Sequence, residues 1–150
     1  MNTIIYFTQK GLDEKRKEYD KLLQERPDAV KELAKAREMG DLSENGYYKG
    51  ARFKLSQIDR DIRHLKYILK MARVKEPTGN GIDIGSTVTL SNGQQEKTYE
   101  IVGTYESNPS LGKISLDSPL GKLLKNKKEG DNVELLTGDK KTTYTITQTS

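Results

Sequence analysis

The sequence has no cysteine, no tryptophan, two phenylalanines and one histidine among 150 residues. Without cysteine there can be no disulfide bonds or thiolate metal sites, which suits a reducing cytoplasm. With a single histidine, His64, a zinc site of paired imidazoles is excluded, and we expect that residue at the surface. No apolar run approaches the ~20 residues of a membrane span, and the first residues lack the pattern of a secretory signal. We therefore expect a cytoplasmic protein with no membrane partner.

Charged residues are abundant but unevenly placed. They make up 32% of the chain and apolar residues 33%, which is thin for a single compact core. Residues 1–76 hold 18 Lys and Arg against 13 Asp and Glu, whereas residues 77–150 hold 8 against 9. Between Lys49 and Lys75 there are nine basic residues and two acidic ones. This basic stretch suggests a polyanion such as nucleic acid as a partner, although a solvated helix face gives the same pattern.

Two long helical patterns fill the first half. The first should run from about Gln9 to Met39, with Thr8 as its N-cap and a kink near Pro27, which lacks a backbone donor. The second carries apolar residues at strict spacings of three and four, as in a coiled-coil seam. This seam consists of Tyr48, Ala51, Leu55, Ile58, Ile62, Leu65, Leu69 and Ala72. Because few residues separate the two patterns, we predict an antiparallel coiled-coil hairpin, assigned to residues 1–76.

The second half changes to a period of two. Pro77 to Gly85 is rich in turn residues and predicts a linker. Alternating or β-branched stretches then predict strands at residues 84–90, 97–105, 112–116, 132–136 and 142–147. Ser118 followed by Pro119 predicts the start of a short helix. We therefore predict an α+β protein, in which the hairpin precedes a small, mostly antiparallel sheet domain over residues 77–150.

The segment between the two helical patterns is acidic. Asp41 and Glu44 lie three residues apart, and residues 38–48 contain no basic residue. Gly40 should end the first helix, and Ser43 should cap the second, with Glu44 in its first turn. Two carboxylates at the end of a hairpin could supply half of a Mg²⁺ site, because that ion requires six oxygens. The same residues could instead only cap the turn and complement the helix dipole.

Two stretches resemble the signatures of a known family. The run Ala-Arg-Glu-Met-Gly-Asp-Leu-Ser-Glu-Asn at residues 36–45 resembles the tip signature of the bacterial transcript cleavage factors GreA and GreB. The run Ser-Pro-Leu-Gly-Lys-Leu-Leu at residues 118–124, with Gly-Asp-Asn-Val at residues 130–133, resembles their C-terminal signature. The resemblance implies a coiled-coil hairpin, a C-terminal domain of FKBP-like fold, and a monomer that acts on bacterial RNA polymerase.

The resemblance also implies roles for particular residues. The C-terminal domain would dock on the polymerase, for which we name Ser118, Pro119 and Leu120, although leucines here could equally be core. The hairpin would enter the secondary channel. Asp41 and Glu44 match the family's acidic pair, so they would be the catalytic residues and would hold Mg²⁺ jointly with the polymerase. The polymerase would then cleave the 3′ end of its backtracked RNA, and the chain alone would not be an enzyme.

The residues just after the acidic segment depart from the family pattern. The family usually continues with a small residue, an acid and a tyrosine, whereas residues 46–48 are Gly-Tyr-Tyr. Tyr47 could stack on a base or cover the hairpin end. Lys49, Arg52 and Lys54 could contact phosphates of the nascent RNA 3′ end without reading its sequence, or form a solvated face.

Two other functions are compatible with this pattern. A protein of this shape could occupy the polymerase channel and modulate transcription without cleavage, although the intact acidic pair argues against this. An FKBP-like domain could also be a peptidyl-prolyl isomerase, but a fold does not imply a function. The second half has three tyrosines and no Phe or Trp, which argues against an aromatic-lined proline pocket.

Overall fold

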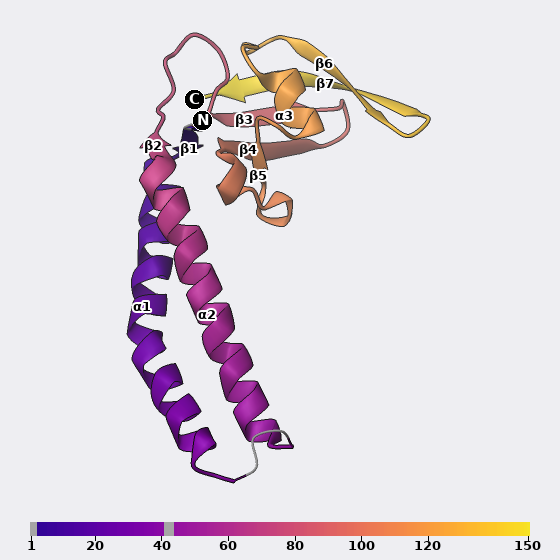
Figure 1. Cartoon of the computed structure of the whole chain (residues 1–150). Coiled ribbons are helices and arrows are strands. Elements are labelled where there is room, and N and C mark those ends of the chain that lie inside the picture. Colours follow the sequence, from indigo (N-terminus) through magenta and orange to yellow (C-terminus); the bar gives the residue numbers. More distant parts are fainter. Residues whose placement is uncertain (1–2, 41–43) are drawn as a thin grey trace. The chain divides into compact units, whose positions relative to one another are not determined.

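The computed structural model in Figure 1 describes residues 3–40 and 44–150. Two long helices come first, α1 (Gln9–Arg37) and α2 (Gly46–Met71). A β-rich part follows, with one short helix, α3 (Pro119–Leu124). The predicted order, a helical hairpin followed by a small sheet with a short helix, is confirmed.

The chain divides into two compact units. One is Asp13–Met71, and the other combines Met1–Leu12 with Ala72–Ser150. The unit that contains the sheet therefore also includes the first residues of the chain, and the predicted domain boundary after residue 76 stays a prediction. Within the described part of the chain, no helix is both long and apolar enough to span a membrane.

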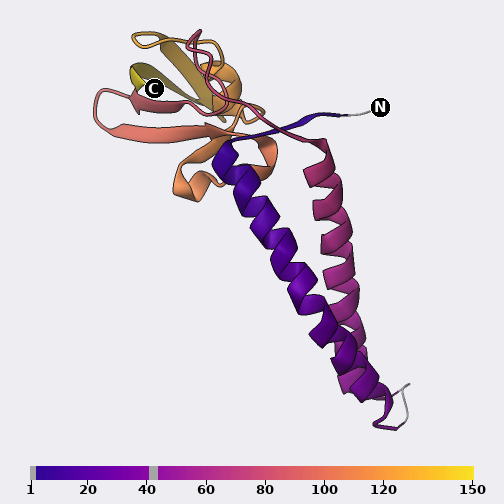
Figure 2. The same ribbon diagram turned by 90° about the vertical axis from the view of Figure 1, so that its left-hand side faces the viewer.

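The two helices of the hairpin run side by side in opposite directions (Figures 1 and 2). Most of the predicted seam lies on the less exposed side of α2. Of the seam residues in α2, Ala51, Ile58 and Leu65 are buried and the other four are half-buried. The last seam residue, Ala72, is buried but follows the helix, and Ile68 is buried although it lies outside the predicted seam. Helix α1 contributes the buried small side chains of Ala29 and Ala36, which allow a close approach.

An ion pair joins the two helices partway along the hairpin. Arg26 of α1 donates to Asp59 of α2, with Nε–Oδ1 and Nη2–Oδ2 distances of 2.6 and 3.4 Å. Such a forked contact fixes the relative orientation of both side chains. The hydrogen bond from Arg26 lowers the pKa of the Asp59 carboxyl below its ordinary value, and it raises the pKa of Arg26. Pro27 follows this pair, and α1 continues through it as one helix.

We predict that Asp59→Asn removes a pH-dependent part of the hairpin's stability. Because the folded pKa of this carboxyl is lowered, the carboxylate stabilises the folded state above its ordinary pKa of about 3.9, and this contribution is lost as the pH falls through the lowered value. Thermal unfolding followed by circular dichroism should show that, as the pH falls below about 3.9, the Tm of the wild type decreases more steeply than the Tm of Asp59→Asn. The difference at pH 7 should be small, because the pair is exposed. Parallel pH profiles of the two proteins would contradict this role.

The sheet has five strands in the order β5-β4-β3-β7-β6. The strands are β3 (Thr87–Ser91), β4 (Glu96–Val102), β5 (Lys113–Ser115), β6 (Asn132–Thr137) and β7 (Lys140–Thr149), all close to the predicted positions. Neighbouring strands are antiparallel except β4 and β5, which are parallel. The sheet is therefore mixed, because two short 3₁₀ turns, η1 (Thr104–Glu106) and η2 (Pro109–Leu111), bring the chain back between β4 and β5.

The core of this unit includes a segment that we predicted to be a linker. The buried cluster consists of Ile82, Val88, Leu90, Ile101, Ile114, Leu124, Val133 and Ile146. Ile82 also exchanges backbone hydrogen bonds with the turn after α3: its N–H donates to Lys127 at 2.9 Å and its carbonyl accepts from Asn126 at 3.0 Å. Ile84 is buried as well. The second part of the predicted linker, residues 81–85, is thus packed into the unit, whereas residues 77–80 are exposed.

The chain enters and leaves the hairpin through paired strands. Strand β1 (Ile5–Phe7) pairs in parallel with β2 (Ala72–Val74). Phe7 is fully buried and stacks on Tyr105 of η1, with ring centroids 6.5 Å apart. These contacts attach the first residues of the chain to the sheet-containing unit.

Glu106 fixes the start of α1 in the same place. Its carboxylate accepts hydrogen bonds from the Thr8 N–H at 2.8 Å, from the Thr8 hydroxyl, and from the Gly103 N–H at 3.0 Å. The Thr8 hydroxyl accepts from the Gly11 N–H at 3.0 Å, which confirms Thr8 as the N-cap. A Cβ atom at Gly11 would collide with the Glu106 carboxylate, so glycine is required for this approach.

Candidate functional site

The last turn of α1 forms one side of the hairpin end. The Met39 N–H donates to the Ala36 carbonyl at 3.2 Å, a tightened turn common at helix ends. Helix α1 ends at Arg37, two residues before the predicted end at Met39, and Gly40 follows the turn with a positive φ of 109°. Asp41 and Ser43, which carry two of our predictions, lie outside the described residues.

Asn45 links the ends of the two helices. Its side-chain Oδ1 accepts from the Tyr48 N–H at 3.1 Å, which makes Asn45 the N-cap of α2. Its Nδ2 donates to the Ala36 carbonyl at 3.1 Å. Because one end of the amide meets an N–H group and the other a carbonyl, the hydrogen-bond pattern selects one amide orientation.

Glu44 is exposed and precedes this cap. Our predictions of Ser43 as the N-cap of α2 and of Glu44 in its first turn are wrong, because α2 begins at Gly46 and is capped by Asn45. In the described part of the chain, no three His, Cys, Asp or Glu side chains gather into a possible metal site.

The three predicted RNA-contacting residues lie on the first turns of α2. Lys49, Arg52 and Lys54 are all exposed. Lys54 forms an ion pair with Glu32 of α1, with an Nζ–Oε2 distance of 3.5 Å. Among the described residues, neither Lys49 nor Arg52 forms an ion pair with an acidic side chain, so these two are better placed than Lys54 to meet a phosphate.

Two aromatic side chains are exposed in the same stretch of α2. Tyr47 and Phe53 have exposed fractions of 51% and 62%. An exposed aromatic ring can stack on a nucleic acid base. Our sequence analysis did not identify Phe53, although its position outside the apolar seam was a usable signal.

The three predicted docking residues lie at the start of α3. The Ser118 hydroxyl accepts from the Gly121 N–H at 3.0 Å and donates to the Ser115 carbonyl at 2.7 Å, so it caps the helix as predicted. Leu120 is partly buried against the core. Pro119 is exposed. Ser118 and Leu120 therefore shape this end of α3, and Pro119 offers the most accessible surface of the three.

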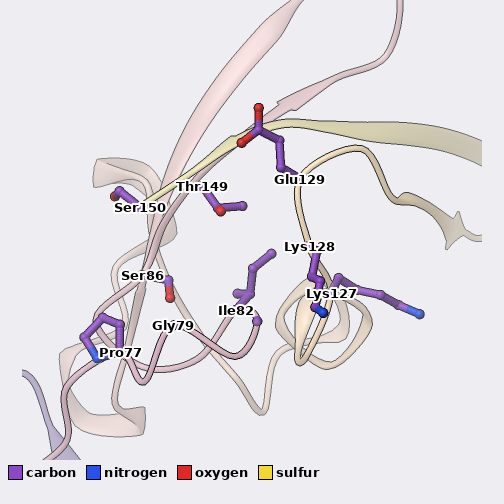
Figure 3. A pocket seen from close by; sticks show the side chains of 10 residues that line it. Pro77, Gly79, Ile82, Ser86, Lys127, Lys128, Glu129, Thr149 and Ser150 are labelled. Atoms are coloured by element: carbon purple, nitrogen blue, oxygen red, sulfur yellow. The ribbon is translucent and has the colours of Figure 1, made fainter.

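A cavity of about 300 Å³ lies elsewhere in the sheet-containing unit (Figure 3). It is lined by Pro77, Gly79, Gly81, Ile82, Ser86, Lys127, Lys128, Glu129, Thr149 and Ser150. None of these residues is aromatic, and the Lys127 side chain extends away from the cavity (Figure 3). The cavity therefore does not fit the aromatic-lined pocket that a proline isomerase would need.

Comparisons with known proteins agree along nearly the whole chain. Residues 5–74 match the family described as "Transcription elongation factor, N-terminal", and residues 76–150 match "Transcription elongation factor, GreA/GreB, C-term". The chain is 40% identical over 138 residues to transcription elongation factor GreA of Paracoccus denitrificans, covering 89% of this chain and 88% of that protein. It is 39% identical over 145 residues to GreA of Neorickettsia sennetsu, covering 93% and 91%.

Among solved structures, the chain is similar to GreA factor homolog 1 (Gfh1) of Thermus thermophilus. The identity is 25%, 99% of each chain is covered, and the TM-score is 0.47. The sequence matches are much stronger than this structural one, and they extend over both the helical hairpin and the sheet. From those two family matches and the identity near 40%, the chain belongs to the GreA/GreB family of transcription elongation factors.

Proposed function

We propose that this elongation factor binds RNA polymerase in its secondary channel and stimulates the polymerase's own Mg²⁺-dependent cleavage of backtracked RNA. The observation that carries the proposal is a long hairpin that ends in an exposed acid, Glu44, within the family's acidic motif. The factor would act through the polymerase and not as a nuclease by itself, because its acids supply only part of a ligand set.

The length of the helices supports insertion into a channel. Helix α1 has 29 residues and α2 has 26. At ~1.5 Å per residue, α2 alone extends about 40 Å. A pair of helices is narrow enough to enter a channel that excludes a globular domain, and helices of this length can reach far into it. In this proposal the hairpin brings Asp41 and Glu44 to the polymerase active site.

The chemistry of the two acids fits a shared Mg²⁺ site. Carboxylate oxygens are preferred ligands of this ion, which usually keeps waters and takes only one or two carboxylates from one protein. A bound Mg²⁺ lowers the pKa of a coordinated water and stabilises developing negative charge. Glu44 is exposed, so its carboxylate is open to a partner. We assign Asp41 to the same Mg²⁺ site because it matches the other acid of the family's acidic pair.

In this function, Lys49 and Arg52 would contact the phosphates of the displaced RNA. We predict that Lys49→Ala/Arg52→Ala lowers stimulated cleavage roughly two- to fivefold at moderate salt and reduces the slope of log binding against log salt by about 1 to 2. The cleavage rate is measured on labelled RNA in a backtracked complex, and binding of the factor to the same complex at several salt concentrations gives the slope. Lys66→Ala/Lys70→Ala, which removes two exposed charges farther along α2, is the matched control. A defect of equal size in the control variant would show that the charges act nonspecifically.

The proposal places polymerase docking at the start of α3. We predict that Pro119→Arg weakens binding to polymerase roughly tenfold, because a bulky charge would stand at the exposed position of this surface. The fold should be retained, since Ser118 still caps the helix. Competition binding with labelled factor measures the effect. Full affinity in this variant would place docking elsewhere on the chain.

The test of the function is a stalled, backtracked bacterial transcription complex with labelled RNA and Mg²⁺. Faster shortening of the RNA 3′ end when the factor is added would support the proposal. Binding without shortening would favour a modulator that occupies the channel without cleavage. Shortening of free RNA by the factor alone would contradict a partial site.

A further inference from the structure

We propose that Asn45 is a positioning residue, which holds the two helix ends together and thereby fixes Glu44. We call its two side-chain hydrogen bonds, to the Ala36 carbonyl and from the Tyr48 N–H, the Asn45 bridge. The geometry of the bridge stands on these contacts alone. Its consequence for RNA cleavage rests on the proposed function.

Asn45 is fixed to α2 at two points. Its backbone carbonyl accepts from the Lys49 N–H at 3.1 Å, the first turn of the helix, while its side chain caps the Tyr48 N–H. An N-cap contact of this kind satisfies a donor that has no partner within the helix. The residue therefore has little freedom relative to α2.

The other end of the same amide reaches α1. The Ala36 carbonyl belongs to the last turn, where carbonyls lack the N–H of a following turn. The Ala36 carbonyl accepts hydrogen bonds from the Met39 N–H at 3.2 Å and from the Asn45 Nδ2 group at 3.1 Å. Ala36 is fully buried and Asn45 is half-buried, so this contact is partly shielded from water. This contact therefore ties the end of α1 to the start of α2.

Glu44 is coupled directly to this bridge. It precedes Asn45, so one peptide unit of about 3.8 Å separates their Cα atoms. A carboxylate that must meet a site in another molecule has to be placed to within a fraction of an ångström for full effect. Without the bridge the helix ends would still be helical, but the peptide that carries Glu44 would lose its tie to α1.

Three substitutions separate the two halves of the bridge. Asn45→Asp keeps an acceptor for the Tyr48 N–H but sets a carboxylate oxygen against the Ala36 carbonyl. Asn45→Ser also keeps a capping acceptor, adds no charge, and is too short to reach α1. Asn45→Ala removes both contacts. Asn92→Asp is the control, because the Asn92 side chain acts as an acceptor for two backbone N–H groups in a sheet turn.

Nuclear magnetic resonance of the ¹⁵N-labelled full chain tests the geometry without any activity. One Nδ2 proton of Asn45 should exchange with solvent at least roughly tenfold more slowly than those of Asn92. The Tyr48 amide should stay protected in Asn45→Asp and Asn45→Ser and lose protection in Asn45→Ala. An Asn45 side chain that exchanges as fast as Asn92 would overturn the bridge.

The backtracked complex tests the consequence. Asn45→Asp and Asn45→Ser should each lower the maximal cleavage rate roughly three- to tenfold, with the factor concentration for half-maximal effect unchanged. If the wild type stimulates cleavage and both variants match it, Asn45 is not a positioning residue. A change in half-maximal concentration alone would also overturn the inference, since that reports docking. If the wild type itself fails to stimulate cleavage, the proposed function fails, while the exchange measurement still decides the bridge.

Discussion

Replacing both Asp41 and Glu44 with alanine should reduce stimulated cleavage of backtracked RNA by roughly 100-fold or more. The effect should be this large because the two carboxylates would help to hold the Mg²⁺ that stabilises the negative charge developing at the reacting phosphate. Binding to polymerase should be nearly unchanged, since we place docking at α3 in the other unit. Labelled RNA and competition binding, measured on the same complexes, give the two quantities.

The single substitutions and one control sharpen this prediction. Asp41→Ala and Glu44→Ala should each lose a large part of the stimulation, and their effects should not add, because both would serve one site. Glu38→Ala removes an exposed negative charge from the turn just after α1 and should retain most of the activity. If Glu38→Ala were as defective as the double variant, net charge at the hairpin end would explain the activity, and two specific ligands would not.

The Gly121→Ala substitution should destabilise the sheet-containing unit by about 2–3 kcal/mol. A Cβ atom at Gly121 would overlap the Ser115 carbonyl oxygen, which belongs to the backbone and cannot turn aside. Helix α3 would have to move away, and with it Leu124, which is fully buried in the core. Urea unfolding followed by tyrosine fluorescence should show a lower midpoint with an unchanged slope.

Gly50→Ala provides the matched control for this effect. Gly50 also lies within a helix, α2, but a Cβ atom there would meet nothing within 4 Å. Alanine should therefore stabilise α2 by up to about 1 kcal/mol, because glycine is a poor helix former. Opposite signs for the two substitutions are expected. A loss of stability at Gly50, or none at Gly121, would contradict the packing described for α3.

Local patterns were enough to predict much of the fold. The spacing of three and four predicted most of the buried side of α2, because such a stripe follows from helix geometry, but it missed the buried Ile68. Ser118 and Pro119 marked the start of α3 for an equally local reason, the capping of unpaired N–H groups. The acidic motif identified the candidate site, which no contact in the described residues would have identified on its own.

What the sequence did not reveal depends on contacts between distant residues. Both Ser and Asn cap helices well, and the choice of Asn45 follows from its second contact, with Ala36. Ile82 sits among turn residues, and its place in the core depends on strands and a turn that lie far from it in sequence. Glu106 reaches Thr8 across 98 positions of sequence. None of these partners leaves a periodic signal.

Titrating Mg²⁺ in the backtracked complex tests most directly whether the hairpin end completes a metal site in the polymerase. The wild-type factor should lower the Mg²⁺ concentration for half-maximal RNA cleavage several-fold relative to polymerase alone, because it adds ligands to the ion. Asp41→Asn should return that concentration towards the value of polymerase alone while the factor stays bound. An Asp41→Asn factor that cleaves slowly with the wild-type Mg²⁺ dependence would contradict a role for this acid as a metal ligand.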